Sequence, residues 1–359
     1  MNETIPVDLK RKFVTLLLKW NRKQNDRKMP WKGERDPYKI WLSEIILQQT
    51  RVQQGLSYYN KFIKTFPDIH KLAKAPDKVI FKMWEGLGYY TRCRNLIISA
   101  RYISKELDGK FPDSYETIRS LKGIGPYTAA AISSFAFDLP YAVVDGNVFR
   151  VLSRVFGIDK PIDSTEGKSF FSKLANELLD KKHSAVYNQA LMDFGAIICK
   201  PALPLCANCI LKKNCIAFLK DRVNVLPVKE KSIRIKNRWF YYLVMEYKNE
   251  IIIRQRASKD IWQQLNEFPL VEMKKHTSPD KIIQVAEGKG WLQDKKYEIV
   301  SISPLIRQKL SHQLISGQFI KIRLSKKIRL EKDNLWIKKN RINQLAFPKF
   351  INQYLRSKE

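Results

Sequence analysis

The strings LKGIGPYTAAAI (residues 121–132) and VVDGN (143–147) decide the fold of this chain. In the first string, glycine permits backbone φ values above zero, and Pro126 suits the first turn of a helix, where its missing N–H costs nothing. We therefore predict two helices joined by a tight turn at Gly123 and Gly125. Such a turn presents backbone N–H groups to an anion, which in a basic protein is expected to be a nucleic-acid phosphate. An ordinary helix–helix turn fits the same string equally well.

Two acidic residues stand in apolar surroundings. Asp145 ends the apolar run of the second string, so it is either a helix N-cap or a catalytic group. Glu44 lies in WLSEIILQQTRV (41–52), inside a stretch that we predict to be one helix from Tyr38 to Gln54. Because its neighbours are apolar on more than one helical face, we expect burial to raise its pKa and make it a proton donor near neutral pH. The alternative is a surface glutamate on an amphipathic helix.

The composition indicates a polyanionic partner. The 359 residues contain 66 Lys and Arg against 35 Asp and Glu, a net charge of +31, which exceeds what solubility requires. A chain of this length predicts two domains. No apolar signal region follows Met1, and no run of about 20 apolar residues occurs. We therefore expect a cytoplasmic, nucleoid-associated protein without membrane contact.

Four clustered cysteines indicate a metal site in a reducing compartment. They are Cys199, Cys206, Cys209 and Cys215, separated by six, two and five residues. Four thiolates this close bind either zinc or an iron–sulfur cluster, and spacing alone leaves both open. Lys212 and Lys213 lie inside this loop, so we expect it to contact phosphate as well. Cys93 stands apart and is expected to pack as a small side chain.

The chain changes character after about residue 220. Before this point helical periodicity dominates, and we predict a helical domain over residues 1–225 that includes the cysteine loop at 199–215. A linker is expected at 226–235. From 236 to 359 several β-rich segments alternate with a helical one, which predicts a separate α+β domain.

These motifs, taken together, resemble those of the MutY-type adenine DNA glycosylases. The hairpin followed by Asp145 resembles the helix-hairpin-helix DNA glycosylases in general. The spacing Cys-x6-Cys-x2-Cys-x5-Cys matches the [4Fe-4S] loop of the endonuclease III and adenine glycosylase branch, and the string around Glu44 is similar to the MutY signature. The resemblance implies an all-α helix-hairpin-helix core with a [4Fe-4S] cluster loop, joined to a C-terminal α+β Nudix-like domain.

The resemblance also implies catalytic roles. Glu44 would protonate adenine, and Asp145, kept ionised, would stabilise the cationic sugar that forms when the N-glycosidic bond breaks. Tyr127 and Asn147 match family positions beside the sugar and the catalytic water. Members that also nick the strand carry Lys at the position of Tyr127. Since tyrosine has no amine for a Schiff base, this chain should be monofunctional.

Other matches concern DNA binding. The base must leave the duplex to reach the catalytic groups, and Gln49, Leu87 and Tyr89 match the positions that wedge into the resulting gap. Trp31 and Arg35 match residues that line the base pocket.

The C-terminal domain resembles the Nudix-like domain of MutY proteins. The Gly-x5-Glu-x7-Arg-Glu-x2-Glu-Glu array of an active Nudix hydrolase is missing from the sequence, so the resemblance implies recognition and not pyrophosphate hydrolysis. Ser311 and His312 match the Phe-Ser-His loop by which the family reads 8-oxoguanine. Here Leu310 replaces the phenylalanine.

The sequence thus predicts an adenine DNA glycosylase of base excision repair. Its expected substrate is double-stranded DNA in which adenine is mispaired with 8-oxoguanine or guanine, and it is expected to act as a monomer. One alternative is an endonuclease III-type pyrimidine glycosylase with lyase activity, against which Tyr127 and Glu44 argue. The other is a basic DNA-binding module with a structural metal, which would have no use for Glu44 and Asp145 together.

Overall fold

The computed structural model describes residues 5–230, 235–257, 260–292, 296–330 and 333–357. The chain divides into two compact units. The first comprises residues 1–73 and 98–232, and the second comprises residues 74–97 and 233–359. The boundaries that we expect from the sequence stay a prediction, and residues 231–234 of the expected linker lie outside the described part.

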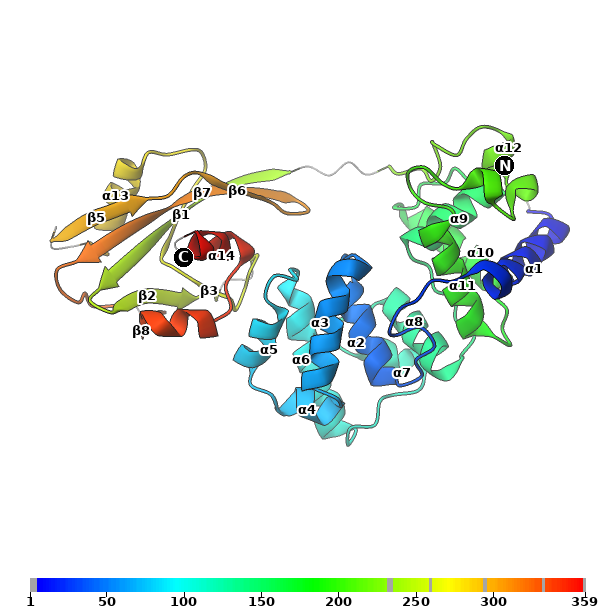
Figure 1. The fold of residues 1–359 in the computed structure, drawn as a ribbon, viewed down its shortest axis with the longest axis horizontal. Coiled ribbons are helices and arrows are strands. Elements are labelled where there is room, and N and C mark those ends of the chain that lie inside the picture. Colours follow the sequence, from blue (N-terminus) through cyan, green and yellow to red (C-terminus); the bar gives the residue numbers. More distant parts are fainter. Residues whose placement is uncertain (1–4, 231–234, 258–259, 293–295, 331–332, 358–359) are drawn as a thin grey trace. The chain divides into compact units, whose positions relative to one another are not determined.

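The first unit is helical (Figure 1). Its helices are α1 (Val7–Gln24), α2 (Pro37–Leu47), α3 (Val52–Thr65), α4 (Ile69–Lys74), α7 (Tyr115–Ser120), α8 (Pro126–Phe137), α9 (Gly146–Phe156), α10 (Thr165–Leu178), α11 (Ser184–Ile197) and α12 (Ile216–Leu219), with short 3-10 turns η1 (Cys206–Asn208) and η2 (Lys212–Asn214). Helix α6 (Tyr90–Glu106) contributes residues to both units. This architecture confirms the helical core that the sequence predicts.

The predicted hairpin is formed by α7 and α8. Ser114 caps α7 by accepting from the Thr117 N–H, and Pro126 occupies the first turn of α8. Gly123 has φ of 84°, in the left-handed region that favours glycine. Small buried residues follow in α8, so α8 can pack closely on both α7 and α2.

The prediction of a single helix from Tyr38 to Gln54 is wrong, because the structure has two helices in this stretch. Helix α2 ends at Leu47, and α3 starts only at Val52. Gln49, between them, has φ of 56°, which a helix cannot accommodate. Helical periodicity continues across this break, so the sequence pattern alone did not reveal it.

The core of the first unit lies among α1, α9, α10 and α11. It contains the fully buried side chains of Phe13, Trp20 and Phe171, and Trp20 contacts Phe194 edge to face at 5.0 Å. Gly195 of α11 faces α9 so closely that a Cβ atom there would lie 2.6 Å from the Cβ atom of Asn147. This close approach holds the start of α9 against α11.

The second unit combines α5 (Asp77–Trp84) with an eight-stranded sheet. The strands are β1 (Lys236–Tyr247), β2 (Glu250–Gln255), β3 (Asn266–Glu267), β4 (Leu270–Met273), β5 (Tyr297–Ile302), β6 (Ile306–Lys309), β7 (Gln313–Leu324) and β8 (Asn334–Lys338), and the other helices are α13 (Pro279–Gly288), η3 (Lys339–Gln344) and α14 (Lys349–Arg356). The strand order is β3-β2-β1-β7-β5, with β4 also paired to β1, β6 to β7 and β8 to β2.

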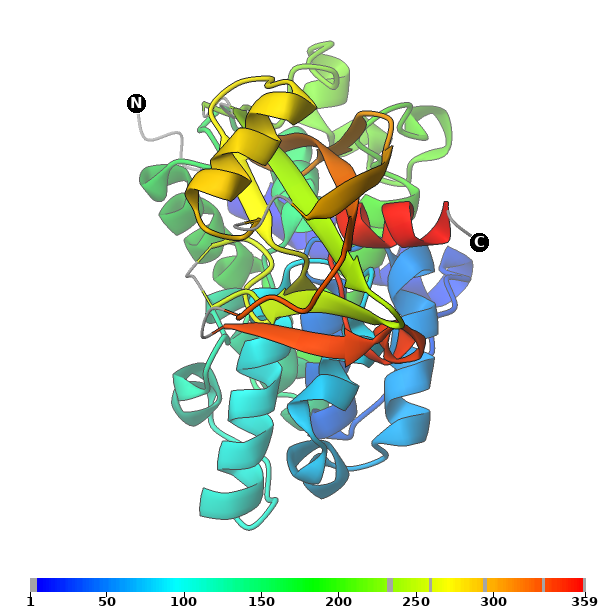
Figure 2. The same ribbon diagram turned by 90° about the vertical axis from the view of Figure 1, so that its left-hand side faces the viewer.

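Strand β1 is the centre of this sheet. It pairs in parallel with β7, so that Lys236 lies opposite Gln313, and it forms a tight antiparallel hairpin with β2. Its side chains alternate between two covered faces. Tyr241 packs in a cluster with residues of α13, whereas Tyr242 stacks on Phe319 and contacts Phe350 of α14. Figures 1 and 2 show the ribbons of the two helices. The structure thus confirms a C-terminal domain of strands and helices.

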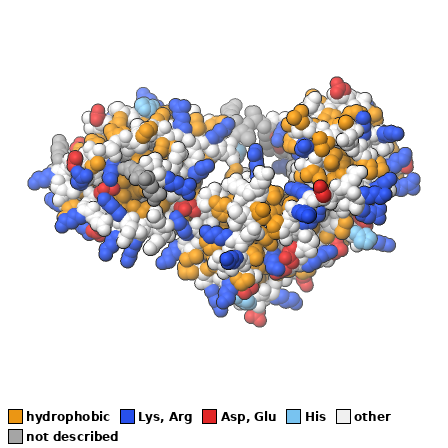
Figure 3. Space-filling model, viewed as in Figure 1, with side chains coloured by type: hydrophobic (Ala, Val, Ile, Leu, Met, Phe, Trp, Pro, Cys, Tyr) orange, Lys and Arg blue, Asp and Glu red, His pale blue; other side chains and the backbone are white. Residues whose placement is uncertain are grey.

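Residues 74–97 belong to the second unit through contacts with its C-terminal part. Lys82 Nζ donates to the carbonyl of Leu345 at 2.9 Å, and the N–H of Phe347 donates to Glu85 Oε1 at 2.8 Å. Lys and Arg side chains cover much of the visible surface (Figure 3), in keeping with the high net charge. Among the described helices, none has both the length and the apolar character needed to cross a membrane.

Candidate active site

A pocket of about 780 Å³ lies within the first unit. Its walls come from the loop before α2, from α2 and the segment after it, and from residues of α8, α9 and α11. Eight residues that the sequence singles out line it: Trp31, Arg35, Glu44, Gln49, Gly125, Tyr127, Asp145 and Asn147. The size is typical of a small-molecule site.

Glu44 is the buried acid of this pocket. Only 7% of the surface of Glu44 is exposed. Burial raises the pKa of Glu44 to about 7, while a hydrogen bond from the Tyr127 hydroxyl lowers it and the charge of Asp145 raises it. A carboxyl group with this pKa is partly protonated at neutral pH and can donate a proton. The expectation of a raised pKa is therefore supported by the surroundings of Glu44.

Asp145 is held in a fixed orientation by Asn147 and α9. Its Oδ1 accepts from the backbone N–H groups of Asn147 and Val148, both at 2.8 Å, so it is the N-cap of α9. Its Oδ2 accepts from Asn147 Nδ2 at 2.6 Å. Burial raises the pKa of Asp145, whereas these donors and the charge of Arg150 oppose that shift. Asp145 is thus the N-cap of α9 and a pocket residue at the same time, so the two predictions made for it from the sequence are compatible.

Arg150 connects this carboxylate to the start of the cysteine loop. Its Nη2 donates to Asn147 Oδ1 at 2.8 Å, and its Nε donates to the carbonyl of Cys199 at 2.7 Å. A further bond runs from Nη2 to the carbonyl of Gly195 at 2.7 Å. Because Oδ1 of the Asn147 side chain accepts from Arg150, Nδ2 of the same side-chain amide must face Asp145.

A third carboxylate, Asp193, organises another wall of the pocket. It is fully buried and accepts from Arg27 Nη1 at 2.8 Å and Gln189 Nε2 at 2.9 Å, and Lys32 Nζ lies 3.0 Å away. These three partners line the pocket. The sequence reasoning missed them. The signal available was an aspartate within the apolar run of α11, the same signal that singled out Glu44.

The remaining pocket residues differ in exposure. Trp31 packs edge to face on Tyr59 at 5.3 Å, and Arg35 is exposed and donates to the carbonyl of Phe135 at 3.1 Å. Gln49 is exposed, with the left-handed φ noted above. Such backbone strain occurs often at functional sites.

The glycines of the hairpin have different roles. Gly123 needs its positive φ, as described above. Gly125 has φ of −92° and ψ of 177°, which any residue adopts, and no atom lies within 4 Å of the place where a Cβ would be. Packing inside the protein therefore does not require glycine at this position. Glycine there leaves the backbone N–H groups at the start of α8 accessible from outside.

All four clustered cysteines line one small hollow beside α9, with apolar walls from Val155, Phe194 and Phe218. Arg154 Nη1 lies 3.5 Å from Cys199 Sγ. Burial raises the pKa of the Cys209 thiol to about 12, so a bound metal must displace its proton. Among the described residues, no three metal-ligating side chains are close enough to hold a single ion. Four soft sulfur donors around one apolar hollow suit a metal–sulfur group in their chemistry.

The neighbouring basic and cysteine residues are placed as follows. Lys213 is exposed, and Lys212 is half-buried with its Nζ 5.1 Å from the ring centre of Phe218. Cys93 is fully buried and burial raises its thiol pKa, in agreement with a packing role.

In the second unit, Leu87 and Tyr89 differ sharply. Leu87 is only 5% exposed, whereas Tyr89 is 43% exposed and has φ of 48°. Only Tyr89 is therefore placed to reach a partner without rearrangement. The Tyr89 hydroxyl is hydrogen-bonded to the Ser311 hydroxyl, and the Arg92 guanidinium lies 5.4 Å from the Tyr89 ring centre.

Ser311 and His312 form the tip of the hairpin between β6 and β7. The N–H of Leu310 donates to the carbonyl of Gln313 at 2.7 Å, which closes the turn. Both tip residues are exposed, and Leu310 is half-buried. Their side chains are thus accessible to a large ligand.

Comparison with known proteins adds to this geometry. Residues 42–177 match the model of the HhH-GPD superfamily of base excision DNA repair proteins, and residues 240–357 match the NUDIX domain model. The chain is 36% identical over 303 residues to the adenine DNA glycosylase of Buchnera aphidicola subsp. Baizongia pistaciae, covering 84% of this chain and 83% of that protein. It is 31% identical over 350 residues to that of Buchnera aphidicola subsp. Acyrthosiphon pisum, covering 96% of each.

Solved structures give the same picture for the helical part. A thermostable thymine-DNA glycosylase superposes with a TM-score of 0.55 at 31% identity, covering 59% of this chain and 98% of that one. A trapped endonuclease III–DNA covalent intermediate superposes with a TM-score of 0.51 at 21% identity, covering 59% of this chain and 98% of that one. The second match shows a shared fold.

Proposed function

We propose, from the premise that this chain belongs to the adenine DNA glycosylase family of base excision DNA repair proteins, that it removes adenine mispaired with 8-oxoguanine or guanine. The observation that carries the proposal is the pocket that brings Glu44 together with Asp145. Burial raises the pKa of both carboxyl groups, to about 7 for Glu44, but Asp145 also accepts three hydrogen bonds that oppose this rise and favour its ionised form. When two carboxyl groups have different environments, one can act as the general acid while the other provides a negative charge.

The reaction follows from these environments. Protonated Glu44 donates its proton to N7 of the extruded adenine, which makes the base a better leaving group. The C1′–N9 bond then breaks with both electrons passing to the base, and ionised Asp145 stabilises the cationic sugar. Water adds at C1′, and its proton returns to the Glu44 carboxylate. The products are free adenine and an abasic site.

Tyr127 and Asn147 orient the two carboxyl groups. The Tyr127 hydroxyl donates to Glu44, and the Asn147 amide donates to Asp145 Oδ2 at 2.6 Å. Tyr127 carries no amine, so a Schiff base with the sugar cannot form at this position. The enzyme is therefore proposed to be monofunctional and to leave the strand intact.

DNA is proposed to bind through the hairpin and the wedge residues. The open space at Gly125 suits a phosphate against the N-terminus of α8, and Gly123 supports the turn. Exposed Gln49 and Tyr89 are proposed to fill the gap left by the base, while buried Leu87 would support the loop that carries Tyr89. Trp31 and Arg35 are proposed to contact the base, and Ser311 with His312 to read 8-oxoguanine.

A [4Fe-4S] cluster is proposed as the resident cofactor. Cys199, Cys206, Cys209 and Cys215 would hold it. The cluster would supply the bonds that tie the loop 199–215 to the helical core. Lys212 and Lys213 in that loop are proposed to contact phosphate. The protein is further proposed to act as a monomer in the cytoplasm, at the nucleoid.

One assay tests the proposed function. Protein is incubated with four duplexes that carry adenine opposite 8-oxoguanine, guanine, cytosine or thymine, and the products are resolved with and without alkali. We expect strand cleavage only after alkali, and only with the first two duplexes. Cleavage without alkali, together with covalent trapping by borohydride, would instead show the lyase chemistry of an endonuclease III-type enzyme. Binding without any excision would show a DNA-binding module.

A further inference from the structure

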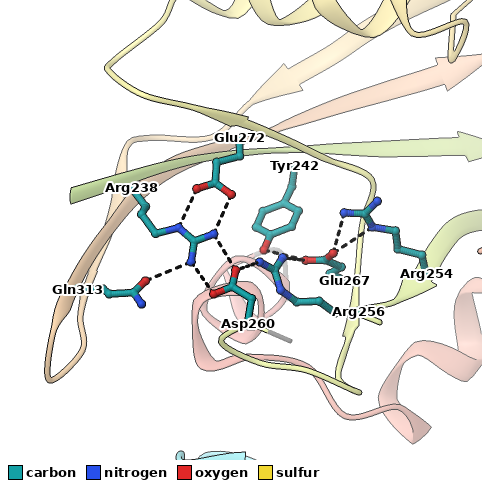
Figure 4. A network of polar contacts seen from close by, with 8 residues as sticks. All are labelled: Arg238, Tyr242, Arg254, Arg256, Asp260, Glu267, Glu272 and Gln313. Atoms are coloured by element: carbon teal, nitrogen blue, oxygen red, sulfur yellow. Dashed lines mark hydrogen bonds and ion pairs between the residues drawn. The ribbon is translucent and has the colours of Figure 1, made fainter. Parts of the chain in front are cut away.

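A cluster of charged side chains lies at one end of the sheet of the second unit (Figure 4). Its members are Arg238, Arg254, Arg256, Asp260, Glu267 and Glu272, joined by Tyr242 and Gln313. Three guanidinium groups and three carboxylates cancel in charge, so this cluster as a whole offers little attraction to phosphate. It requires an explanation other than DNA binding, because burying charged groups is costly unless they are paired.

Arg238 uses its full hydrogen-bonding capacity in this cluster. Its side chain is 8% exposed. It makes two bonds to Glu272, both at 2.7 Å, two to Asp260 at 2.9 and 2.7 Å, and one to Gln313 Oε1 at 3.2 Å. A guanidinium has five N–H donors. All five are therefore engaged, and the side chain is locked in one orientation.

Asp260, one of the two carboxylates bound to Arg238, is itself bound by a second arginine. Asp260 also accepts from Arg256 Nη2 at 2.6 Å, and Arg256 in turn donates to Glu267 at 2.8 Å. Burial acts to raise the pKa of Asp260, but hydrogen bonds from Arg238, Ile261 and Arg256 lower it overall. The carboxylate is thus ionised, and each pair in the network restrains the next.

Gln313 is the point where this network reaches the Ser311–His312 turn. It follows His312 directly and its carbonyl closes the turn by accepting from the Leu310 N–H. On the opposite side, the N–H of Lys236 donates to the carbonyl of His312 at 2.9 Å. The turn is therefore fixed to β1 at two places, by the backbone of Lys236 and by the side chain of Arg238.

We propose that Arg238 is a positioning residue for the opposite-base reader, acting through Gln313 on the Ser311–His312 turn. The inference rests on the proposed role of that turn. Reading two adjacent atoms of a base requires hydrogen-bonding groups placed to within a fraction of an ångström. Apart from the bond between the Ser311 and Tyr89 hydroxyls, the two exposed tip residues depend on the backbone of the turn for their positions. The locked guanidinium supplies a rigid support from outside the turn.

The test separates this support from general stability. Gln313→Leu removes the link while the four bonds from Arg238 to carboxylates remain. Gln313→Glu keeps an acceptor oxygen and should preserve the link. Gln318→Leu is the matched control, since Gln318 lies on the same strand and its side chain donates to the carbonyl of Ser303 at 3.0 Å. Full-length protein is used for each, and the melting temperature checks folding.

The readout is the ratio of single-turnover excision rates for adenine opposite 8-oxoguanine and opposite guanine. Gln313→Leu should lower this ratio about two- to tenfold, the range expected for one hydrogen bond, while Gln313→Glu and Gln318→Leu keep it. A lower ratio for Ser311→Ala with an unchanged ratio for Gln313→Leu overturns the positioning role and leaves the proposed reader standing. An unchanged ratio for both overturns the reader as well. Equal slowing of both substrates by Gln313→Leu also overturns the positioning role.

Discussion

Asn147 donates a 2.6 Å hydrogen bond from its side-chain amide to Oδ2 of Asp145, while Oδ1 of the same carboxylate caps α9. The two oxygens of Asp145 thus have separate tasks. Asparagine is as good an N-cap as aspartate. Replacing Asp145 with Asn should therefore leave the helix cap intact, while it removes the negative charge and the acceptor of the bond from Asn147 Nδ2.

Asp145→Asn should bind mismatched duplex and fail to turn it over, since the sugar cation loses its counter-charge. Binding is measured by a gel-shift titration and turnover by single-turnover excision. Asp138→Asn is a matched control, because Asp138 also accepts from a backbone N–H, that of Ala185 at 2.9 Å, and does not itself line the pocket. Normal turnover by Asp145→Asn would reduce Asp145 to a structural cap.

Glu44→Gln should lower excision about 10²- to 10⁴-fold, the usual contribution of general acid catalysis, and leave DNA binding in place. Glutamine keeps the shape of the side chain but cannot release a proton to adenine. Glu177→Gln, which affects an exposed ion pair with Lys10, is the control and should excise normally. Near-normal excision by Glu44→Gln removes this residue from the mechanism.

The pH dependence of excision should be bell-shaped. Glu44 must be protonated, and its pKa is raised to about 7, so the single-turnover rate should fall as pH rises through this value. Asp145 must be ionised, so the rate should also fall at low pH, where it takes up a proton. In Glu44→Gln the residual rate should lose the alkaline limb. If this variant keeps the same alkaline limb, another group controls it.

Metal content tests the cysteine loop. Purified protein should contain about four iron and four sulfide per chain if the loop holds a [4Fe-4S] cluster. Cys209→Ser should lower the iron content and the melting temperature, because the loop loses one bond to the core. Cys93→Ala should keep the iron content, since Cys93 belongs to the other unit and does not line the hollow that the four cysteines share. Stoichiometric zinc without sulfide would show the other metal that the spacing allows.

Opposite-base selection should depend on the hairpin tip. Ser311→Ala with His312→Ala removes the side-chain donors and acceptors that could distinguish 8-oxoguanine from guanine. Two lost hydrogen bonds correspond to about 1–3 kcal/mol of preference. Excision opposite the two bases is compared under limiting enzyme and under single turnover, with Ser325→Ala, an exposed serine of the same unit, as control. Equal slowing of both substrates, or no change, would show that the match to the Phe-Ser-His loop is accidental.

Local chemistry made several parts of this protein predictable. Gly123 and Pro126 specify a turn and a helix start through their own backbone preferences, so the hairpin could be located from residue types alone. The apolar neighbours of Glu44 indicated that it is buried, because residues three and four positions apart share a helix face. The family resemblance added roles that periodicity could not supply.

Only the tertiary structure revealed the features that arise where segments far apart in the chain pack against each other. The break at Gln49 lies inside a continuous helical pattern, so local periodicity does not encode it. The two helices pack closely on either side of the break, since a Cβ at Gly55 of α3 would lie 2.8 Å from a side-chain carbon of Leu47. The partners of Asp193 and Arg238 come from segments far apart in the chain, and no local preference encodes such ion pairs. The sequence therefore determined which residues could do the chemistry, whereas packing determined their protonation, orientation and support, because these depend on what surrounds a side chain in space.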